Sequence, residues 1–291
     1  MTLRVDEISG LATVQDLGRP GHAHAGVPAG GAADALSLRL ANRAVGNDAG
    51  AAAVELAIGP MRVRAESGCT VCVTSGPRAF EAVELAAGQS LEIAPDAGLC
   101  RAYLAVAGGI DVPVILGSRC TLLGAGFGGL EGRALRSGDA IHVGKAGDHA
   151  ASVPLAMRAM AGFAARRRVL RVVTDGAEAP LPAGVLRVSP NSDRVGVRLD
   201  RTGAMPEAQP LVHSRGVLHG TIQMPSTHEL VILGPDGPTT GGYPTVGTVI
   251  AADLPAVGQL CPGQWMRLEA VSREEALGAL RAQRDGMDRL D

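Results

Sequence analysis

One glycine-rich turn and the strand behind it stand out in the sequence: Thr239-Thr240-Gly241-Gly242-Tyr243-Pro244, followed by the apolar run Val246–Ile250. Paired glycines allow positive φ angles and let backbone N–H groups approach a ligand closely. The threonine and tyrosine hydroxyls add donors and acceptors, and the proline fixes the corner. The stretch therefore predicts either a ligand-binding loop or a plain tight turn between two strands.

A second segment of the same kind lies near the N-terminus, Thr13-Val14-Gln15-Asp16-Leu17-Gly18-Arg19-Pro20-Gly21. It places Gln15, Asp16 and Arg19 within five residues of one another. Its glycines and its proline argue against regular structure, and loops on a rigid scaffold are where binding residues concentrate. The alternative is an Asp16–Arg19 ion pair that only closes a turn.

Composition limits the classes of function. The 291 residues are 46% apolar and 19% charged, with a formal net charge of −2, which suits one large or two ordinary domains. Near-neutral charge and only 2% aromatic residues argue against a nucleic-acid or anionic-membrane surface. The sequence shows neither a long apolar run nor a signal-peptide core, and its five cysteines are an odd number, so we expect a cytoplasmic protein.

Forty glycines and eighteen prolines predict many short strands. We expect a first half over residues 1–150 and a second half over residues 165–291, the latter ending in a helix that a capping box opens at Ser272. One helix is expected in the first half, over Ala35–Val45, with Asp34 as its N-cap. The expected strands are Ala53–Ile58, Thr70–Thr74, Ser90–Ile93, Arg101–Val106, Ala140–Val143, Val169–Val173, Val185–Val188, Val195–Leu199, Leu230–Leu233, Thr248–Ile250 and Trp265–Leu268.

Lysine usage excludes two mechanisms. Lys145 is the only lysine, and its surroundings fit neither the phosphate-binding P-loop nor a Schiff-base site. Cys69 and Cys72 have the C-x-x-C spacing but lie in a predicted strand, where residues three apart face opposite sides. We therefore expect no metal site.

The second half contains Asn191-Ser192-Asp193-Arg194-Val195-Gly196-Val197-Arg198-Leu199. Alternation predicts that the apolar side chains from Val195 onward point inward and that Arg194 lies on the other face, half-exposed at a strand edge. A guanidinium there suits a carboxylate or phosphate ligand, or else a rim salt bridge. Gln223, after Gly220-Thr221-Ile222, offers an amide to a ligand amide or carboxylate.

Together these segments resemble the family known as allophanate hydrolase subunit 2, also called biotin-dependent carboxyltransferase, KipA or the C subunit of 5-oxoprolinase. The resemblance spans nearly the whole chain. Its motifs are Thr13–Gly21, Gly26–Asp34, Leu40–Arg43, Tyr103–Ile110, Leu116–Arg119, Ala125–Leu130, Ser192–Arg194, Gly220–Pro225 and Thr239–Pro244.

The resemblance implies a mainly β protein with a few helices, made of two cyclophilin-like β-barrel halves. It implies a protein that works in a heteromeric complex with a partner like KipI or the B subunit of 5-oxoprolinase, inactive alone, on a small amide or carboxylate substrate. The leading hypothesis is ATP-dependent opening of 5-oxoproline to glutamate. The alternatives are a carboxyltransferase subunit of a urea carboxylase/allophanate hydrolase-type system, whose biotin is attached to another protein, and a non-catalytic KipA-like regulator.

For the leading hypothesis we assign catalytic roles to Asp16 as base and to Arg19 and Arg194 as anion holders, with the Gly241 and Gly242 amides stabilising an oxyanion. The substrate-binding set is Gln15, Arg119, Asp193, Gln223, Thr239, Thr240, Gly241, Gly242 and Tyr243. One small substrate would require the two glycine-rich segments to lie within ~15 Å of each other. The chain departs from the family pattern at Thr245, Ser226–His228 and Pro238, which leaves the substrate open.

Overall fold

The computed structural model describes residues 1–76, 79–147, 153–201, 212–226 and 229–288. These residues form two compact units. Unit 1 comprises residues 1–19 and 30–162, and unit 2 comprises residues 20–29 and 163–291. The chain therefore passes between the units three times, and the short segment 20–29 belongs with the C-terminal part of the sequence.

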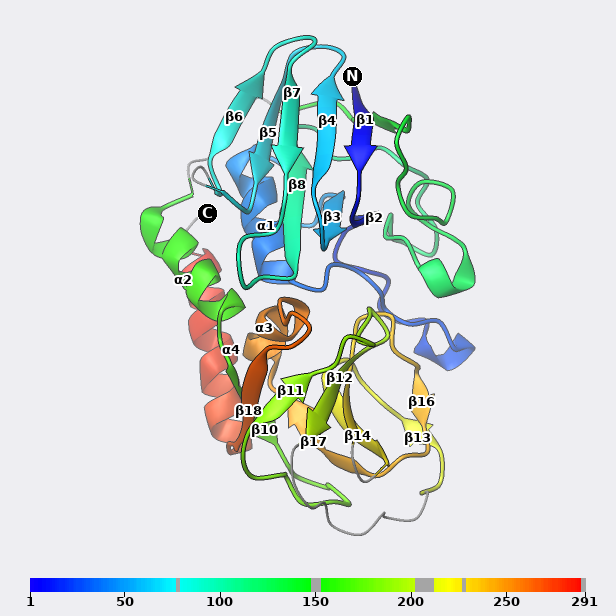
Figure 1. Cartoon of the computed structure of the whole chain (residues 1–291), viewed down its shortest axis with the longest axis vertical. Helices are drawn as coiled ribbons and strands as arrows, with labels where there is room; N and C mark the ends of the chain where they lie inside the picture. The colour runs from blue at the N-terminus through cyan, green and yellow to red at the C-terminus, as the bar shows by residue number, and fades with distance from the viewer. Residues whose placement is uncertain (77–78, 148–152, 202–211, 227–228, 289–291) are drawn as a thin grey trace. The chain divides into compact units, whose positions relative to one another are not determined.

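Unit 1 consists of two antiparallel sheets (Figure 1). The four-stranded sheet has the order β7-β4-β1-β9, and the five-stranded sheet has the order β2-β3-β8-β5-β6. The strands are β1 (Thr2–Ile8), β2 (Leu11–Gln15), β3 (Ala53–Ala57), β4 (Met61–Ala65), β5 (Cys69–Val73), β6 (Ala82–Leu85), β7 (Ser90–Ile93), β8 (Arg101–Val106) and β9 (Ala140–His142).

Both sheets contribute to one apolar core, with Leu3 and Val63 from the first and Leu56 and Leu104 from the second fully buried. Alternate residues point inward along β1 and β4, whereas every residue of the central strand β8 is buried. In the described residues of unit 1 the sheets remain separate, so the closed barrel expected for each half is found only in unit 2.

Helix α1 (Ala35–Ala44) packs on β8 and β5. As predicted, Asp34 is its N-cap and accepts a hydrogen bond from the backbone N–H of Ser37 at 2.9 Å. The hydroxyl of Tyr103 accepts from the Asp34 N–H at 2.8 Å and donates to Glu55 at 2.8 Å. This buried network fixes the start of the helix against the sheet.

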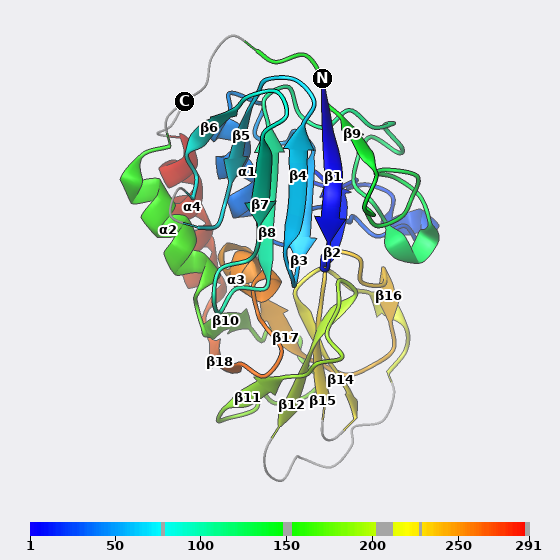
Figure 2. The same cartoon turned by 45° about the horizontal axis from the view of Figure 1, so that its top comes forward.

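Unit 2 contains a closed barrel with the order β10-β17-β14-β15-β12-β11-β18, in which β18 returns beside β10 in parallel (Figure 2). Its strands are β10 (Val169–Val173), β11 (Leu186–Val188), β12 (Gly196–Arg201), β14 (Thr221–Ser226), β15 (Glu229–Leu233), β17 (Thr245–Val249) and β18 (Trp265–Ala270). The inward-facing residues, such as Leu170, Leu199 and Ile222, form the core.

A two-stranded ribbon, β13 (Arg215–Gly216) and β16 (Thr240–Gly241), lies outside the barrel order. The remaining elements are short helices and the long terminal helix, whose capping box forms as predicted between Ser272 and Glu275. They are η1 (Ala23–Ala25), η2 (Leu123–Ala125), α2 (Leu155–Ala165), η3 (Ala251–Asp253), α3 (Leu254–Gly258) and α4 (Arg273–Asp288).

The mainly β class is confirmed, and two local expectations are corrected. The residues Thr13–Gln15 are not irregular, because they form the end of β2 and pair with β3. Val195 does not point inward, since it precedes β12 and is 48% exposed, whereas Val197 and Leu199 are buried.

Candidate functional site

Three polar residues predicted from the N-terminal segment, Gln15, Asp16 and Arg19, all bind residues 115–121. The carboxylate of Asp16 accepts hydrogen bonds from the Gly18 N–H at 2.8 Å, the Ser118 hydroxyl at 2.6 Å and the Arg119 N–H at 2.6 Å. Both carboxylate oxygens are therefore occupied by donors of the protein itself. This geometry is that of a loop anchor, and it argues against Asp16 as a free general base.

Arg19 is 1% exposed and is among the largest fully buried side chains of the described residues. It does not pair with Asp16. Its Nη2 donates to the carbonyl oxygen of Cys120 at 2.5 Å, its Nε donates to that of Ile115 at 3.4 Å, and its guanidinium lies over the ring of Phe127 at 4.8 Å. The alternative of an Asp16–Arg19 ion pair that closes a turn is therefore wrong. Arg19 instead holds the neighbouring loop through these contacts, which we call the Arg19 clamp.

Gln15 completes this group. Its Nε2 donates to the Thr13 hydroxyl at 2.9 Å and to the Thr121 carbonyl at 3.2 Å. Among the described residues, the buried Oε1 of Gln15 and Nη1 of Arg19 have no hydrogen-bond partner. Arg119 is half-exposed, and its Nε donates to the carbonyl of Val112 at 3.0 Å.

Arg194 is buried rather than half-exposed, which corrects the expectation from strand alternation. It is 7% exposed and forms a two-pronged ion pair with Asp236, at 2.7 Å and 2.9 Å. Asp193 caps the following turn by accepting from the N–H groups of Val195 and Gly196. Both residues have local structural partners, although the Asp193 side chain remains exposed.

Positive φ is not the reason for the glycines at 241 and 242, since neither adopts that conformation. A Cβ at Gly241 would overlap with Nε2 of Gln223 and would lie 3.5 Å from Val217. A glycine is needed there because the Gln223 amide lies against the backbone. Two predicted site elements, Gln223 and the Thr239–Pro244 turn, are thus brought together.

Gln223 itself is 4% exposed, and its buried Nε2 has no hydrogen-bond partner among the described residues. The other polar residues of the turn are more accessible. Thr240 is exposed and Tyr243 is 42% exposed, whereas Thr239 is intermediate. A buried amide donor below hydroxyl-bearing residues is a suitable recognition point for a ligand oxygen.

Sequence reasoning missed a polar cluster next to Gln223. Thr245 pairs with Gln223 across the β14–β17 ladder. Glu178 accepts from the Thr245 N–H at 2.9 Å, from its hydroxyl at 2.8 Å and from Nη2 of Arg215 at 2.7 Å. Burial raises the pKa of Glu178, but these hydrogen bonds outweigh it, so that the net pKa is lowered and the carboxylate stays ionised.

His219 was also missed. Burial lowers its pKa to about 4, and the positive charge of Arg194 adds to the effect. The imidazole is therefore neutral at physiological pH. No sequence signal marks His219, Glu178 or Arg215, because their contacts are with residues far away in the sequence: Glu178 and Arg215 bind Thr245, and His219 lies near the charge of Arg194.

Of the positions that depart from the family pattern, Thr245 is buried in the cluster just described and Pro238 is exposed. Ser226 ends β14, and Thr227 and His228 lie outside the described residues. The described residues hold no group of three metal-ligating side chains. Cys69 and Cys72 are free thiols, and burial raises the pKa of Cys72 to about 12.

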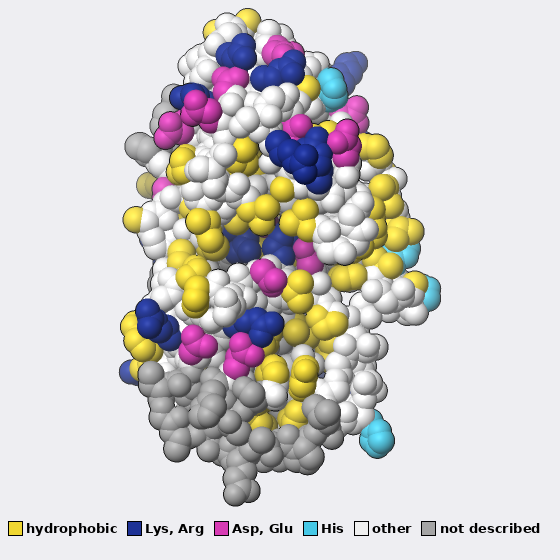
Figure 3. Space-filling model, turned by 45° about the vertical axis from the view of Figure 1, so that its right-hand side comes forward, with side chains coloured by type: hydrophobic (Ala, Val, Ile, Leu, Met, Phe, Trp, Pro, Cys, Tyr) yellow, Lys and Arg dark blue, Asp and Glu magenta, His cyan; other side chains and the backbone are white. Residues whose placement is uncertain are grey.

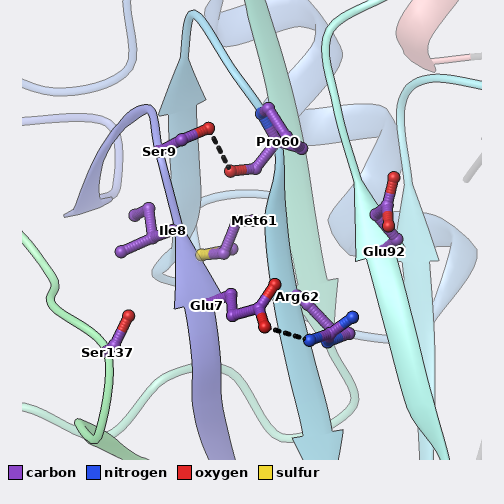
Figure 4. A pocket seen from close by; sticks show the side chains of 8 residues that line it. All are labelled: Glu7, Ile8, Ser9, Pro60, Met61, Arg62, Glu92 and Ser137. Atoms are coloured by element: carbon purple, nitrogen blue, oxygen red, sulfur yellow. Dashed lines mark hydrogen bonds and ion pairs between the residues drawn. The ribbon is translucent and has the colours of Figure 1, made fainter.

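A surface pocket of about 300 Å³ lies elsewhere in unit 1 and includes none of the predicted site residues (Figure 4). Glu7 of β1 and Arg62 of β4 form an ion pair across it, and Ser9 donates to the Pro60 carbonyl at 3.4 Å. Its one arginine is already paired with Glu7, and it contains none of the residues that the sequence singled out, so it is a weaker candidate than the Gln223 region.

The visible face in Figure 3 carries acidic and basic side chains interspersed with apolar ones, without a broad region of one sign. No helix in the described part of the chain is long and apolar enough to cross a membrane.

Comparison with known proteins gives consistent results. Residues 25–270 match the family described as "Carboxyltransferase domain, subdomain A and B". The C subunit of 5-oxoprolinase from Escherichia coli strain K12 is 34% identical over 99% of this chain and 97% of its own length. The protein of the same name from Haemophilus influenzae is 33% identical over 93% of the chain and 91% of its own length.

Larger proteins contain a similar region. The urea amidolyase of Saccharomyces cerevisiae is 30% identical over 96% of this chain, which corresponds to 17% of that enzyme. The crystal structure of the Kluyveromyces lactis urea carboxylase superposes with a TM-score of 0.88 and 27% identity. It covers the whole of this chain, which in turn spans 29% of that protein.

Proposed function

The chain belongs to the family of carboxyltransferase domains with subdomains A and B, and from this we propose that it is the C subunit of an ATP-dependent 5-oxoprolinase-type enzyme. One observation carries the proposal. The two bacterial proteins named as C subunits of 5-oxoprolinase match this chain over 97% and 91% of their own lengths, whereas the yeast urea amidolyase does so over 17%. The chain thus corresponds to nearly the whole of each C subunit and to a small part of the larger enzyme.

The proposed reaction is hydrolysis of the C–N bond of the 5-oxoproline lactam, coupled to ATP hydrolysis in the complex. The chain would act in the cytoplasm with a partner similar to the B subunit of such enzymes, and it would be inactive alone. Its own contribution would be binding and orientation of the lactam, because the Asp16 carboxylate and the Arg194 guanidinium already have protein partners. The Gln223 region is the proposed substrate site.

The test is glutamate release from 5-oxoproline by the reconstituted subunits, with ATP and with ATP omitted. We expect release only when ATP and all subunits are present. An intact complex that binds normally and releases no glutamate would refute the 5-oxoprolinase proposal and leave a carboxyltransferase subunit or a KipA-like regulator as the explanation.

A second candidate is a carboxyltransferase subunit. The family description and the TM-score of 0.88 to the urea carboxylase structure favour it. The single lysine, Lys145, does not lie in a biotin-carrier motif, so carboxybiotin would have to come from another protein. Transfer of labelled carboxyl groups from a carboxybiotin carrier to urea, with no ATP-dependent glutamate release, would favour this candidate.

A further inference from the structure

The side-chain amide of Gln223 is a buried hydrogen-bond donor without an acceptor among the described residues. Gln223 lies in the middle of β14, between Val231 of β15 and Thr245 of β17. Its side chain is 4% exposed, and its buried Nε2 has no acceptor among the described residues. Because burying an N–H group without a partner is unfavourable, such a group in a folded protein calls for an explanation, and a ligand oxygen supplies one.

The segment that lies against the Gln223 amide is a short ribbon. The backbone of Gly241 lies against that amide, and Gly241 belongs to the ribbon β13–β16, whose two strands pair with each other (Figure 1). Each ribbon strand is only two residues long, and Arg215, Gly216 and Thr240 are exposed. Short ribbons with exposed backbone hydrogen bonds are among the first parts of a protein to open locally.

One polar anchor holds the ribbon. Arg215 donates through Nη2 to Glu178 at 2.7 Å and to the Thr245 hydroxyl at 2.8 Å. Glu178 and Ala179 also bind the Thr245 carbonyl through their N–H groups, at 2.9 Å and 3.0 Å. The anchor attaches the ribbon next to the cross-strand neighbour of Gln223.

Charge in this region indicates the kind of oxygen that fits. Arg215, the arginine next to Thr245, is paired with Glu178, and two further arginines of unit 2 are also paired with carboxylates: Arg194 with Asp236 and Arg198 with Glu229. These pairs neutralise the cations that would otherwise attract a carboxylate. The unpartnered donor is a neutral amide, which suits a neutral carbonyl acceptor.

We propose that Gln223 recognises the carbonyl oxygen of a neutral amide, lactam or ureido group, and that the β13–β16 ribbon lifts to admit it. This inference deepens the proposed function, on which the choice of 5-oxoproline as substrate rests. Under this inference the lactam carbonyl of 5-oxoproline binds at Gln223, and its carboxylate binds at a different place.

Two variants test the contact without disturbing the core. Gln223→Met keeps the volume and removes the donor. Gly241→Ala places a methyl group where Nε2 of Gln223 now lies, and we expect the flexible amide to move aside. The backbone can accept the alanine because φ at Gly241 is not positive. The matched control is Gly216→Ala in the facing strand of the same ribbon, where an added methyl group meets no atom within 4 Å.

Hydrogen–deuterium exchange of residues 212–217 and 239–243 is measured on the full chain with three probes. These are 5-oxoproline, 2-pyrrolidinone (the lactam without the carboxylate) and proline (the carboxylate without the lactam carbonyl). We expect the two lactams to slow exchange in the wild type and in Gly216→Ala, and to bind about tenfold more weakly to Gln223→Met and Gly241→Ala. Proline should have no effect.

Three outcomes overturn the inference: no slowing by either lactam in the wild type, equal slowing in Gln223→Met, or slowing by proline alone. Its failure is distinguishable from failure of the proposed function. If the complex releases glutamate and Gln223→Met keeps the wild-type KM, the function stands and the inference falls. If 2-pyrrolidinone slows exchange only when Gln223 is present, while no glutamate is released, the inference stands and the function falls.

Discussion

The ion pair of Arg194 with Asp236 is expected to contribute strongly to stability. Both side chains are nearly inaccessible, at 7% and 6% exposed. Removing the guanidinium in Arg194→Ala leaves a buried carboxylate without its partner, which typically costs about 3–5 kcal/mol. Urea denaturation should therefore show a loss of this size in the free energy of unfolding.

Arg198→Ala is the matched control, because Arg198 is 43% exposed and pairs with the partly exposed Glu229. An exposed pair contributes less than about 1 kcal/mol. If the two variants lost equal stability, the burial argument for Arg194 would be wrong.

His219 is expected to make unit 2 sensitive to acid. Its pKa is about 4 in the folded chain and 6.5 as a free side chain. Between these values the unfolded chain binds more protons, so stability is present above pH 6.5 and is lost as the pH falls toward 4. The effect should be on the order of 1–3 kcal/mol.

The measurement is the free energy of unfolding at several pH values for the wild type and for His219→Gln. The variant should lose less stability between pH 6.5 and 4. Parallel pH profiles for the two proteins would show that His219 is not the titrating group.

The sequence alone pointed to some residues of the candidate site and missed others, and each outcome has a physical reason. Gln223 and Gly241 were found because an amide and a paired glycine are unusual within strand and turn patterns. Glu178 and Arg215 were missed because they lie 37 residues apart in segments without a pattern, and Thr245 joins them only in three dimensions. Arg194 was misjudged because alternation predicts the face of a residue but not its partner.

At the scale of elements, the loop that follows η2 is expected to depend on Gly128. Gly128 has φ +78°, and a Cβ there would overlap with the Cys120 carbonyl and lie 3.0 Å from Nη2 of Arg19. Gly128→Ala should therefore destabilise unit 1 by at least about 2 kcal/mol, through backbone strain and displacement of the Arg19 clamp.

Gly124→Ala, in the adjacent η2, is the control, since Gly124 has no positive φ and an added methyl group meets no atom within 4 Å. We expect a change within about 0.5 kcal/mol. Thermal denaturation of both variants checks the difference, and equal melting temperatures would contradict the role of Gly128.

Element prediction succeeded where one physical signal dominated. The strands Ser90–Ile93, Arg101–Val106 and Val169–Val173 have the predicted bounds, and a proline, a glycine or a polar residue follows each within two residues of its end. The first strand, Thr2–Ile8, carries a buried alternation at Leu3 and Val5 that was overlooked. Closure of the barrel through the parallel pair β10–β18 depends on residues about 98 positions apart, such as Val169 and Arg267, which no local pattern reveals.

At the scale of the whole molecule, the charged residues that the sequence singled out as catalytic are already bound to other groups of the protein among the described residues. The Asp16 carboxylate is occupied by three donors, and Arg194, Arg198 and Arg215 of unit 2 are paired with carboxylates. Phosphate activation by a P-loop is excluded by the sequence around Lys145. Under the proposed function, this chain binds the amide and a second protein supplies the groups that activate it.

We therefore predict a stable heteromeric complex with a protein similar to the B subunit of 5-oxoprolinase. The interface should bury at least about 1,200 Å² in total, which is the lower end for a specific stable complex. Sedimentation of the purified chain with and without the partner should show a single larger species for the mixture. The isolated chain should release no glutamate from 5-oxoproline with ATP. Turnover by the chain alone would mean that its own residues activate the lactam, and the assignment of Asp16 as an occupied anchor would then have to be abandoned.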